Sequence, residues 1–278
     1  MIIWIVSYPK SGNTWVRSFL SAYYYSKDGD FNFKLLKNIE QYPQKKFLKK
    51  SINKPADISS YWKTSQEEII KNKEIKFFKT HNSLLSINGN DFTSEKYTLG
   101  AIYIIRDPRN VVTSLKNHFA LNYEESLKFM LNERKFIHDQ REKDYSDFHF
   151  LSSWSNHYKS WLNEKSFRKI IIKYEDLEKN TYKTFEELVT FINSLSNIKK
   201  KISKKIIQNC IESTSLEKLK QKEKISGFSE SITSNFSNKK IDFFHLGPKN
   251  KWEKILPIEL HEKINKTFEK DLKFFKYI

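Results

Sequence analysis

Four short runs rich in apolar residues recur along the chain, and polar loops and segments with helical spacing separate them. The runs cover residues 2–6, 75–81, 98–105 and 170–174 and contain many β-branched and aromatic side chains. Runs of this kind, bounded by polar turns, predict β-strands. The third run is apolar enough to predict a central strand that is covered on both faces.

Helical spacing of apolar residues fills the segments between these runs. It predicts helices over residues 14–25, 111–119, 153–162, 181–194 and 257–274, short helices near 34–39 and 65–70, a charged helix-like segment over 120–150, and a helix within 199–225. Residues 226–238 are rich in Ser and Asn with few apolar anchors, which predicts a mobile loop.

Strands that alternate with helices favour a parallel sheet with right-handed crossovers. No Pro-, Gly- or Ser-rich linker divides the 278 residues. We therefore predict a single domain over residues 1–278. Its expected fold is α/β, a P-loop-like three-layer arrangement in which helices flank a central parallel sheet of about four to five strands.

The formal net charge of +17 raises the question of a nucleic-acid or other anionic partner. However, 44 of the 50 basic residues are Lys, and they are spread along the chain. Base readout and bidentate phosphate binding favour Arg instead. A solvated Lys-rich surface is the favoured interpretation, attraction of anionic ligands or substrates is the alternative, and we predict no nucleic-acid partner.

The single cysteine, Cys210, excludes an internal disulfide and a cysteine-based zinc site, and a small buried apolar role is favoured for it. No apolar run approaches the roughly 18 residues of a membrane span. The N-terminus lacks the pattern of a signal peptide. We therefore expect a cytoplasmic protein without stable membrane insertion, and the sequence leaves its oligomeric state open.

Polar residues follow the first strand and lead directly into a helix. The stretch from Ser7 to Asn13 contains Pro9 and Gly12, and helical spacing begins at Thr14. A strand, a tight loop and a helix in this order present free backbone N–H groups to an anion. Lys10 adds a positive charge, and the hydroxyls of Ser11 and Thr14 add donors. The stretch therefore predicts a phosphate or sulfate cradle.

Polar residues also follow the second and third strands. Lys79 and His81 alternate onto one side of their strand, and His81 lies at its carboxyl end, where active sites of open α/β sheets occur. An isolated His is nevertheless more often structural. Arg106 and Ser114 are eight residues apart, so both can reach one anion between strand and helix. Arg109 either joins them or pairs with Asp107.

Five short motifs occur in one order along the chain: Tyr8–Trp15, Lys79–His81, Arg106–Val111 with Ser114, Tyr174–Leu177, and Gly247–Trp252. Together they resemble the sulfotransferases that use 3′-phosphoadenosine 5′-phosphosulfate (PAPS), especially the soluble, cytosolic-type branch. The resemblance implies sulfuryl transfer to a hydroxyl or amine of a small-molecule or saccharide acceptor. It also implies adenosine 3′,5′-bisphosphate (PAP) as the product and no requirement for a metal.

The resemblance implies roles for individual residues. Lys10 would stabilise charge on the bridging oxygen, His81 would be the general base for the acceptor, and Lys79 would lie beside the sulfuryl group. The other residues would bind the cofactor, with the 5′-phosphate on Ser11, Gly12, Asn13 and Thr14, the adenine at Trp15, Tyr174, Thr214, Ser215 and Leu216, and the 3′-phosphate on Arg106 and Ser114.

Elementary chemistry is consistent with these roles. Sulfuryl transfer resembles phosphoryl transfer, in which a loose in-line transition state requires positioning and positive charge. A His with its usual pKa near 6.5 suits the removal of an acceptor proton at neutral pH. The donor needs two anion sites, and the sequence offers one after the first strand and one after the third.

Two departures from the family pattern lie near the C-terminus. Where the family usually has Arg-Lys-Gly against the 3′-phosphate, this chain has His245, Leu246 and Gly247. Asn250 replaces a second Gly of the family pattern. A Leu side chain cannot bind phosphate. Either Lys249 or Lys251 compensates, or the 3′-phosphate is held more weakly.

The acceptor pocket is expected to come from residues 26–70, 82–96, 120–150 and 226–240. Its aromatic candidates, which would suit an apolar, aromatic or sugar-like acceptor, are Phe31, Phe33, Tyr42, Tyr61, Trp62 and Phe92. Aromatic residues at such spacing are as often part of a core.

Two other functions compete with sulfuryl transfer. An ATP-dependent P-loop kinase or NTPase would need Gly-x-x-x-x-Gly-Lys-Ser/Thr, whereas Lys10 here precedes the single Gly12. A non-enzymatic binder of RNA or another anionic polymer on the same fold would explain the net charge and the missing basic pair. The joint presence of Lys79, His81 and Arg106 argues against such a binder.

Overall fold

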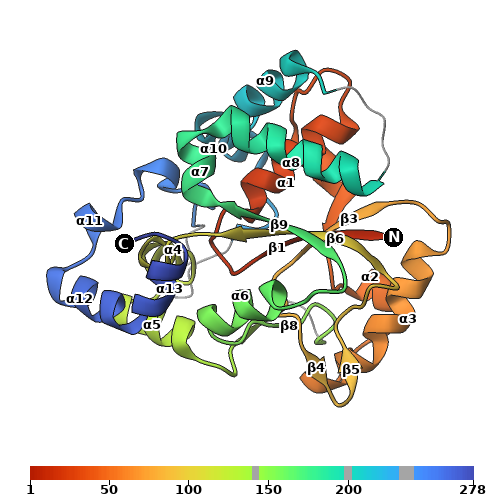
Figure 1. Ribbon diagram of the computed structural model, residues 1–278, viewed down its shortest axis with the longest axis horizontal. Helices are drawn as coiled ribbons and strands as arrows, with labels where there is room; N and C mark the ends of the chain where they lie inside the picture. Colours follow the sequence, from red (N-terminus) through yellow and green to blue (C-terminus); the bar gives the residue numbers. More distant parts are fainter. Residues whose placement is uncertain (140–143, 197–201, 232–240) are drawn as a thin grey trace.

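A five-stranded parallel sheet lies at the centre of the computed structural model, which describes residues 1–139, 144–196, 202–231 and 241–278 (Figure 1). Among these residues the strand order is β2 (Ile39–Gln41), β3 (Lys76–Thr80), β1 (Ile2–Ser7), β6 (Thr98–Ile105) and β9 (Arg168–Lys173). Every neighbouring pair is parallel. The predicted α/β fold is confirmed, and β2 is a fifth strand that the apolar pattern did not indicate.

Strand β1 occupies the middle of the sheet because both of its faces are apolar. Ile2, Trp4 and Val6 pack into one hydrophobic cluster, whereas Ile3 and Ile5 pack into a second cluster on the other side. Successive side chains of a strand point to opposite faces, so an unbroken apolar run is buried on both. The first predicted strand is thereby confirmed.

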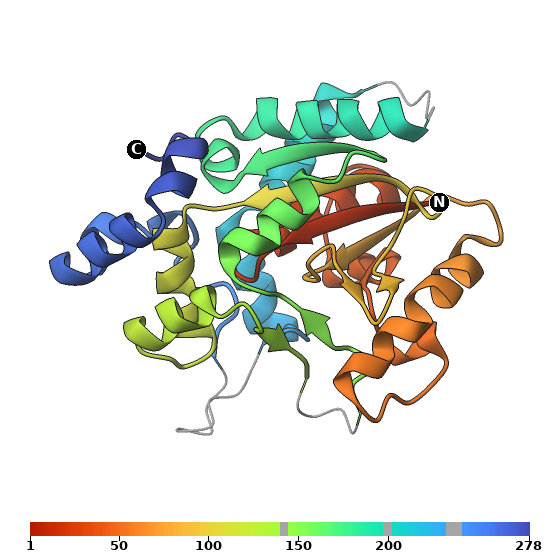
Figure 2. The ribbon, with the colours of Figure 1, turned by 60° about the horizontal axis from the view of Figure 1, so that its bottom comes forward.

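Helices cover both faces of the sheet (Figures 1 and 2). The face of Ile3 and Ile5 packs against α1 (Asn13–Tyr25), α8 (Thr181–Ser196), α9 (Lys204–Ser213) and α10 (Leu216–Ser226). The opposite face packs against α3 (Ser59–Ile70), α4 (Pro108–His118), α5 (Tyr123–Leu131), α6 (Trp154–Leu162), α12 (Ile258–Thr267) and α13 (Glu269–Phe274). In the described part of the chain, no helix has both the length and the apolar character that crossing a membrane requires.

Shorter elements connect these layers. They are the helices α2 (Lys45–Leu48), α7 (Tyr174–Lys179) and α11 (Trp252–Ile255), the 3₁₀ helices Phe33–Asn38, Pro55–Ile58 and Gly247–Lys249, and two small antiparallel sheets formed by β4 (Ser86–Ile87) with β5 (Asn90–Asp91) and by β7 (Phe136–Ile137) with β8 (His149–Phe150).

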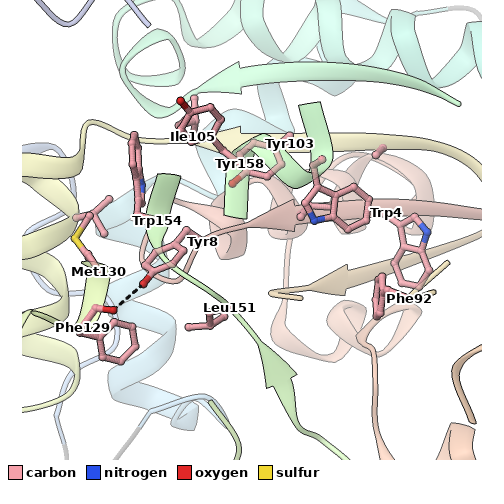
Figure 3. Packing of buried hydrophobic residues seen from close by; sticks show 14 of the residues in the cluster. Trp4, Tyr8, Phe92, Tyr103, Ile105, Phe129, Met130, Leu151, Trp154 and Tyr158 are labelled. Atoms are coloured by element: carbon pink, nitrogen blue, oxygen red, sulfur yellow. Dashed lines mark hydrogen bonds between the residues drawn. The ribbon is translucent and has the colours of Figure 1, made fainter. Parts of the chain in front are cut away.

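Aromatic side chains fill the core on the α6 side of the sheet (Figure 3). Trp154 and Tyr158 are buried, so the helix predicted over 153–162 packs these aromatic residues into the core. Tyr8, from the loop after β1, points toward α5 and donates a hydrogen bond to the carbonyl of Phe129 over 3.4 Å. This contact ties the loop to the helical layer. On the other side Cys210 is fully buried among apolar residues, as expected.

The charged segment 120–150 is not one helix, contrary to its spacing. Helix α5 starts at a capping box formed by Asn122 and Glu125 and ends at Leu131. The next residues are exposed and charged, and they offer no apolar face that would hold further helical turns against the core. Strand β7 pairs instead with β8. Residues 140–143 lie outside the described residues.

Other boundaries also differ from the pattern. The short helix expected at 65–70 is the end of α3, and the helix expected within 199–225 is two helices because the Ser215 side chain caps the start of α10. The last predicted helix is divided at Phe268 into α12 and α13. Of the loop predicted over 226–238, residues 232–238 lie outside the described residues, as do 197–201.

The carboxyl ends of the parallel strands meet at one edge of the sheet. There β1 ends at Ser7 and β3 ends at Thr80, and each is followed by a polar loop. After β6, Asp107 caps helix α4 by accepting a hydrogen bond from the Arg109 backbone over 2.9 Å, and a proline occupies the first helical position. Helix α4 therefore starts directly after Arg106, at the same edge as the loop that follows β1.

Gly12→Ala tests the turn between β1 and α1. Gly12 has φ of +99°, and a Cβ atom there would lie 2.5 Å from Cδ2 of Tyr174. We expect the free energy of unfolding to fall by roughly 1–3 kcal/mol from backbone strain, with a further loss from the clash. Denaturant unfolding measures the change.

Gly89→Ala is the matched control, because Gly89 also has a positive φ, +77°, but no atom lies within 4 Å of a Cβ there. An equal loss of stability in both variants would contradict the role given to the Tyr174 contact.

Candidate functional site

A cavity of about 2000 Å³ opens at the carboxyl edge of the sheet. It collects most of the residues singled out in the sequence from seven separate segments of the chain. The predicted residues that line it are Lys10, Gly12, Asn13, Thr14, Trp15, Lys79, His81, Arg106, Ser114, Tyr174, Thr214, Leu216, His245, Leu246 and Gly247. Ser11 and Ser215 lie beside it without being part of the lining.

The loop after β1 has the geometry of an anion cradle. Lys10 and Gly12 both have left-handed backbone conformations, with φ of +67° and +99°, and α1 begins at Asn13. The first turn of a helix leaves backbone N–H groups without intrahelical partners. The Ser11 hydroxyl is buried and has no hydrogen-bond partner among the described residues. The Asn13 amide nitrogen, in contrast, is used internally, because it donates to the carbonyl of Ile5 over 3.1 Å.

Lys10 is a half-buried cation with an aromatic neighbour. Its Nζ lies 4.2 Å from the centre of the Phe243 ring, a cation–π distance. Burial, and then the charge of Arg106, lower the pKa of Lys10 to about 7, while Glu230 acts to raise it. Lys10 is therefore close to its midpoint of protonation at neutral pH, and any anion placed beside it stabilises the charged form.

Arg106 and Ser114 converge as predicted. Nη1 of Arg106 donates to the Ser114 hydroxyl and to the carbonyl of Lys10, each over 3.2 Å. The guanidinium lies 3.9 Å from the centre of the Tyr174 ring. Its Nε is buried, and no residue in the described part of the chain forms a hydrogen bond with it. Arg109, in contrast, pairs with Asp107 over 2.6 Å and stacks on Trp252 at 4.0 Å, so the alternative of a structural Arg109 is confirmed.

Asn250 fastens the C-terminal motif to α4. Its amide nitrogen donates to the Ser114 hydroxyl and to the carbonyl of Asn110, each over 2.9 Å. Its oxygen accepts a hydrogen bond from Thr113 over 2.7 Å. Lys251 is held by Glu178 over 3.2 Å. In this structure Asn250 therefore has a positioning contact with the Arg106–Ser114 pair that a glycine could not make.

Aromatic residues form the wall opposite the loop. Tyr174 covers Gly12, and Trp15 contacts Tyr174 and Phe185 edge-on with ring centres 5.9 and 5.8 Å apart. The Trp15 indole N–H is buried, and within the described ranges it has no hydrogen-bond partner. The hydroxyl of Thr214 donates to the carbonyl of Cys210 over 2.6 Å, so this side chain is engaged in its own helix end.

His81 is held in one orientation. Its Nδ1 lies 2.7 Å from the carbonyl oxygen of Ser7, and because a carbonyl only accepts, Nδ1 carries the proton. Nε2 is then the basic nitrogen. Burial, followed by the charges of Lys79 and His149, holds the pKa of His81 well below its usual value. The imidazole is therefore neutral at physiological pH and able to accept a proton.

His157 holds the backbone of His81, and no pattern in the sequence indicated this role. Nε2 of His157 donates to the backbone carbonyl of His81 over 3.0 Å, and its Nδ1 accepts a hydrogen bond from Tyr103 over 2.7 Å. Burial lowers the pKa of His157 to about 4, so it stays neutral. His157 and Tyr103 therefore fix the backbone at the carboxyl end of β3.

Glu230 pairs with two cations in the cavity. Its oxygens lie 2.7 Å from Nζ of Lys79 and 2.5 Å from Nη1 of Arg17. Burial acts to raise the pKa of Glu230, but the charges of Lys79 and Arg17 outweigh this effect and lower the pKa to about 2. The sequence reasoning missed both Glu230 and Arg17, because they lie in segments whose pattern carries no motif.

The aromatic residues proposed for an acceptor pocket belong mostly to the core. Those that are fully buried in hydrophobic clusters are Phe31, Tyr42, Trp62 and Phe92. Phe33 does line the cavity. The sequence did not single out the other cavity aromatics, which are Phe119, Phe129, Phe228, Phe243 and Phe244.

Known proteins resemble this chain in sequence over nearly its whole length. A family model described as a sulfotransferase domain matches residues 2–276. The chain is 21% identical to Sulfotransferase 1B1 of the dog, Canis lupus familiaris, over 278 residues that cover 96% of this chain and 82% of the relative. It is 23% identical to human Sulfotransferase 1E1 over 274 residues that cover 97% of this chain and 83% of the relative.

Solved structures share the fold at low identity. Retinol dehydratase in complex with androsterone and the inactive cofactor PAP has a TM-score of 0.60 and 17% identity, covering 98% of this chain and 80% of that one. Retinol dehydratase with retinol and PAP has a TM-score of 0.60 and 18% identity, covering 98% and 81%. Mouse sulfotransferase SULT7A1 with PAP has a TM-score of 0.55 and 18% identity, covering 96% and 83%. The resemblance indicated by the five motifs is confirmed.

Proposed function

The chain belongs to the sulfotransferase domain family, and we propose that it transfers a sulfuryl group from PAPS to a hydroxyl or amine of a small-molecule or saccharide acceptor. One observation carries this proposal. The cradle at Lys10, the Arg106–Ser114 pair and the neutral His81 beside Lys79 line one cavity. The names of the structural relatives add support, because each of those proteins was solved with PAP.

The polar groups of the cavity fit a polyanionic nucleotide. The Ser11 hydroxyl beside the cavity, and the Trp15 indole N–H and Nε of Arg106 on its lining residues, are buried without partners among the described residues, and buried donors in folded proteins are normally satisfied. All three groups are hydrogen-bond donors, and phosphate oxygens are acceptors. We assign the 5′-phosphosulfate to the loop of residues 10–14 and the 3′-phosphate to Arg106 and Ser114.

The reacting end of the donor would lie between the cradle and β3. Charge builds on the bridging oxygen as the sulfuryl group leaves, and Lys10 is placed to neutralise it. Nε2 of His81 takes the proton of the acceptor, while the bond from Nδ1 to Ser7 keeps the ring oriented during transfer. Lys79 supplies positive charge beside the sulfuryl group.

The remaining volume of the cavity would hold the acceptor. Apolar rings of Phe33, Phe119 and Phe129 share it with polar groups such as Gln41 and His149. Androsterone and retinol, named with one structural relative, are small molecules that carry a hydroxyl. A hydroxylated small molecule is the acceptor class that we propose to screen first.

Binding and transfer assays test the proposal together. Calorimetry should give much tighter binding of PAP than of ATP, with or without magnesium. A screen of hydroxylated small molecules and saccharides with ³⁵S-labelled PAPS should yield a labelled product. Magnesium-dependent ATP binding without PAP binding would contradict the proposal.

His81→Asn tests the general base. An Asn amide can still donate to the Ser7 carbonyl, but it cannot take up a proton. We expect turnover with the best acceptor of the screen to fall by roughly 10²- to 10⁴-fold, with the dissociation constant for PAP nearly unchanged. Steady-state kinetics and calorimetry give the two values, and a variant that keeps the parental rate would rule out His81 as the base.

Arg106→Ala tests the 3′-phosphate site. Loss of hydrogen bonds to a charged group should weaken PAP binding by roughly 1.5–3 kcal/mol. The exposed Arg134 gives a control, because Arg134→Ala removes the same charge at a residue that does not line the cavity. Calorimetry with both variants measures the difference, and equal affinities would place the 3′-phosphate elsewhere.

Lys10 predicts a pH dependence of binding. With its pKa at about 7 in the free protein, Lys10 is charged below pH 7 and gains no proton on binding there. Above pH 7 the bound phosphate restores the charge, so affinity for PAP should fall by up to roughly tenfold per pH unit. Calorimetry between pH 7 and 9 measures this fall. Lys10→Arg, which stays charged, should lose the dependence, and an unchanged slope would contradict the assignment.

A further inference from the structure

We propose that Glu230 is a specificity-determining residue, an internal carboxylate that competes with the sulfuryl group of the donor for Lys79 and Arg17. The inference rests on the proposed function, because Lys79 is assigned there to the sulfuryl group. Its consequence is that Glu230 sets the ratio between the affinities for PAPS and for PAP. Nothing in the five family motifs includes this residue.

The contacts of Glu230 are those of a bound anion. One oxygen accepts from Lys79 over 2.7 Å and the other accepts from Arg17 over 2.5 Å. The two cations are only 4% and 7% exposed as whole residues. A buried cation needs a compensating anion, and Glu230 supplies one for both.

Glu230 is held at this position by its own segment. The carboxylate of Glu223, on α10, accepts hydrogen bonds from the Ser231 hydroxyl over 2.7 Å and from the backbone N–H groups of Phe243 and Phe244 over 2.9 and 3.1 Å. One side chain therefore anchors the chain on both sides of residues 232–240. Phe228 packs against Phe243 and Phe244 and adds an apolar anchor.

Competition follows from charge. A sulfuryl oxygen that approaches Lys79 would share the cation with a carboxylate that is fully ionised, and two like charges in one desolvated site oppose each other. PAPS binding must therefore displace Glu230 or weaken its contact with Lys79. PAP lacks the sulfuryl group, and its two phosphates are assigned to the cradle and to Arg106. Glu230 therefore acts on PAP binding only through its smaller influence on the charge of Lys10.

Recognition of a cationic acceptor by Glu230 is the less favoured role. Both carboxylate oxygens are already engaged by cations. The charges of Arg17, Lys79 and Glu230 sum to a net positive value, which would repel a third cation. The same surplus of positive charge attracts an anion.

Glu230→Gln is the direct test. The amide keeps the shape and removes the charge, so affinity for PAPS should rise by about tenfold while affinity for PAP changes much less, because PAP places no group beside Lys79. Calorimetry with each nucleotide in the absence of acceptor measures the ratio. Glu67→Gln is the matched control, because exposed Glu67 also pairs with a lysine, Lys96, but lies far from the cavity lining. The control should leave both affinities unchanged.

Hydrogen exchange on the parental protein provides a second test that does not depend on the folding of the variant. PAPS should raise amide exchange in residues 227–231 relative to PAP, because only PAPS displaces the Glu230 side chain. Equal exchange with both nucleotides would overturn the proposal. So would an unchanged or lowered PAPS affinity in Glu230→Gln. If the parental protein binds neither nucleotide, the proposed function fails and this inference with it, whereas binding of both with an unaltered ratio refutes the role of Glu230 alone.

Discussion

The burial of positive charge is the constraint on which the rest of the site depends. Lys79, Arg106 and Arg17 are almost inaccessible to solvent, and Lys10 is desolvated enough for its pKa to fall to about 7. Removing cations from water is unfavourable unless hydrogen bonds and anions replace the lost solvation. Backbone carbonyls accept hydrogen bonds from Arg17 and Arg106. The rings of Tyr174 and Phe243 form cation–π contacts with Arg106 and Lys10. The carboxylate of Glu230 pairs with Lys79 and Arg17. A site prepared in this way favours an anionic ligand over a neutral one, because the ligand completes a solvation that the protein only partly provides.

The same charges help to determine the protonation state of His81. A histidine beside Lys79 is held neutral by burial and by repulsion between like charges, so its Nε2 is available before any acceptor arrives. The Ser7 carbonyl fixes which nitrogen is basic, and His157 fixes the backbone that carries the ring. Protonation during transfer would be opposed by Lys79 but favoured by the nearby carboxylate of Glu230. His81 and Glu230 are thus electrostatically coupled.

Sequence reasoning found the parts of this site that depend on local chain geometry. The strand at 2–6 and the turn with Gly12 follow from short-range rules, and the pairing of Arg106 with Ser114 follows from the spacing between a strand end and the first turn of a helix. Contacts between remote segments were not predictable. Glu230 reaches Arg17 across 213 residues, and no local pattern encodes such a pair. The prediction of helix over the charged segment 120–150 was wrong for a related reason. Helical spacing alone does not stabilise a helix that has no apolar surface to pack against.

The missing basic pair near the C-terminus has a structural counterpart in Asn250. The Ser114 hydroxyl accepts hydrogen bonds from both Arg106 and Asn250, and a hydroxyl oxygen has two lone pairs to offer. Its own hydrogen is therefore available as a donor toward the cavity that it lines. Two donors that fill the acceptor positions of one hydroxyl also polarise its O–H bond. With the 3′-phosphate assigned to this pair, as we propose, it meets one guanidinium and one oriented hydroxyl, so the affinity of that site should depend heavily on Arg106.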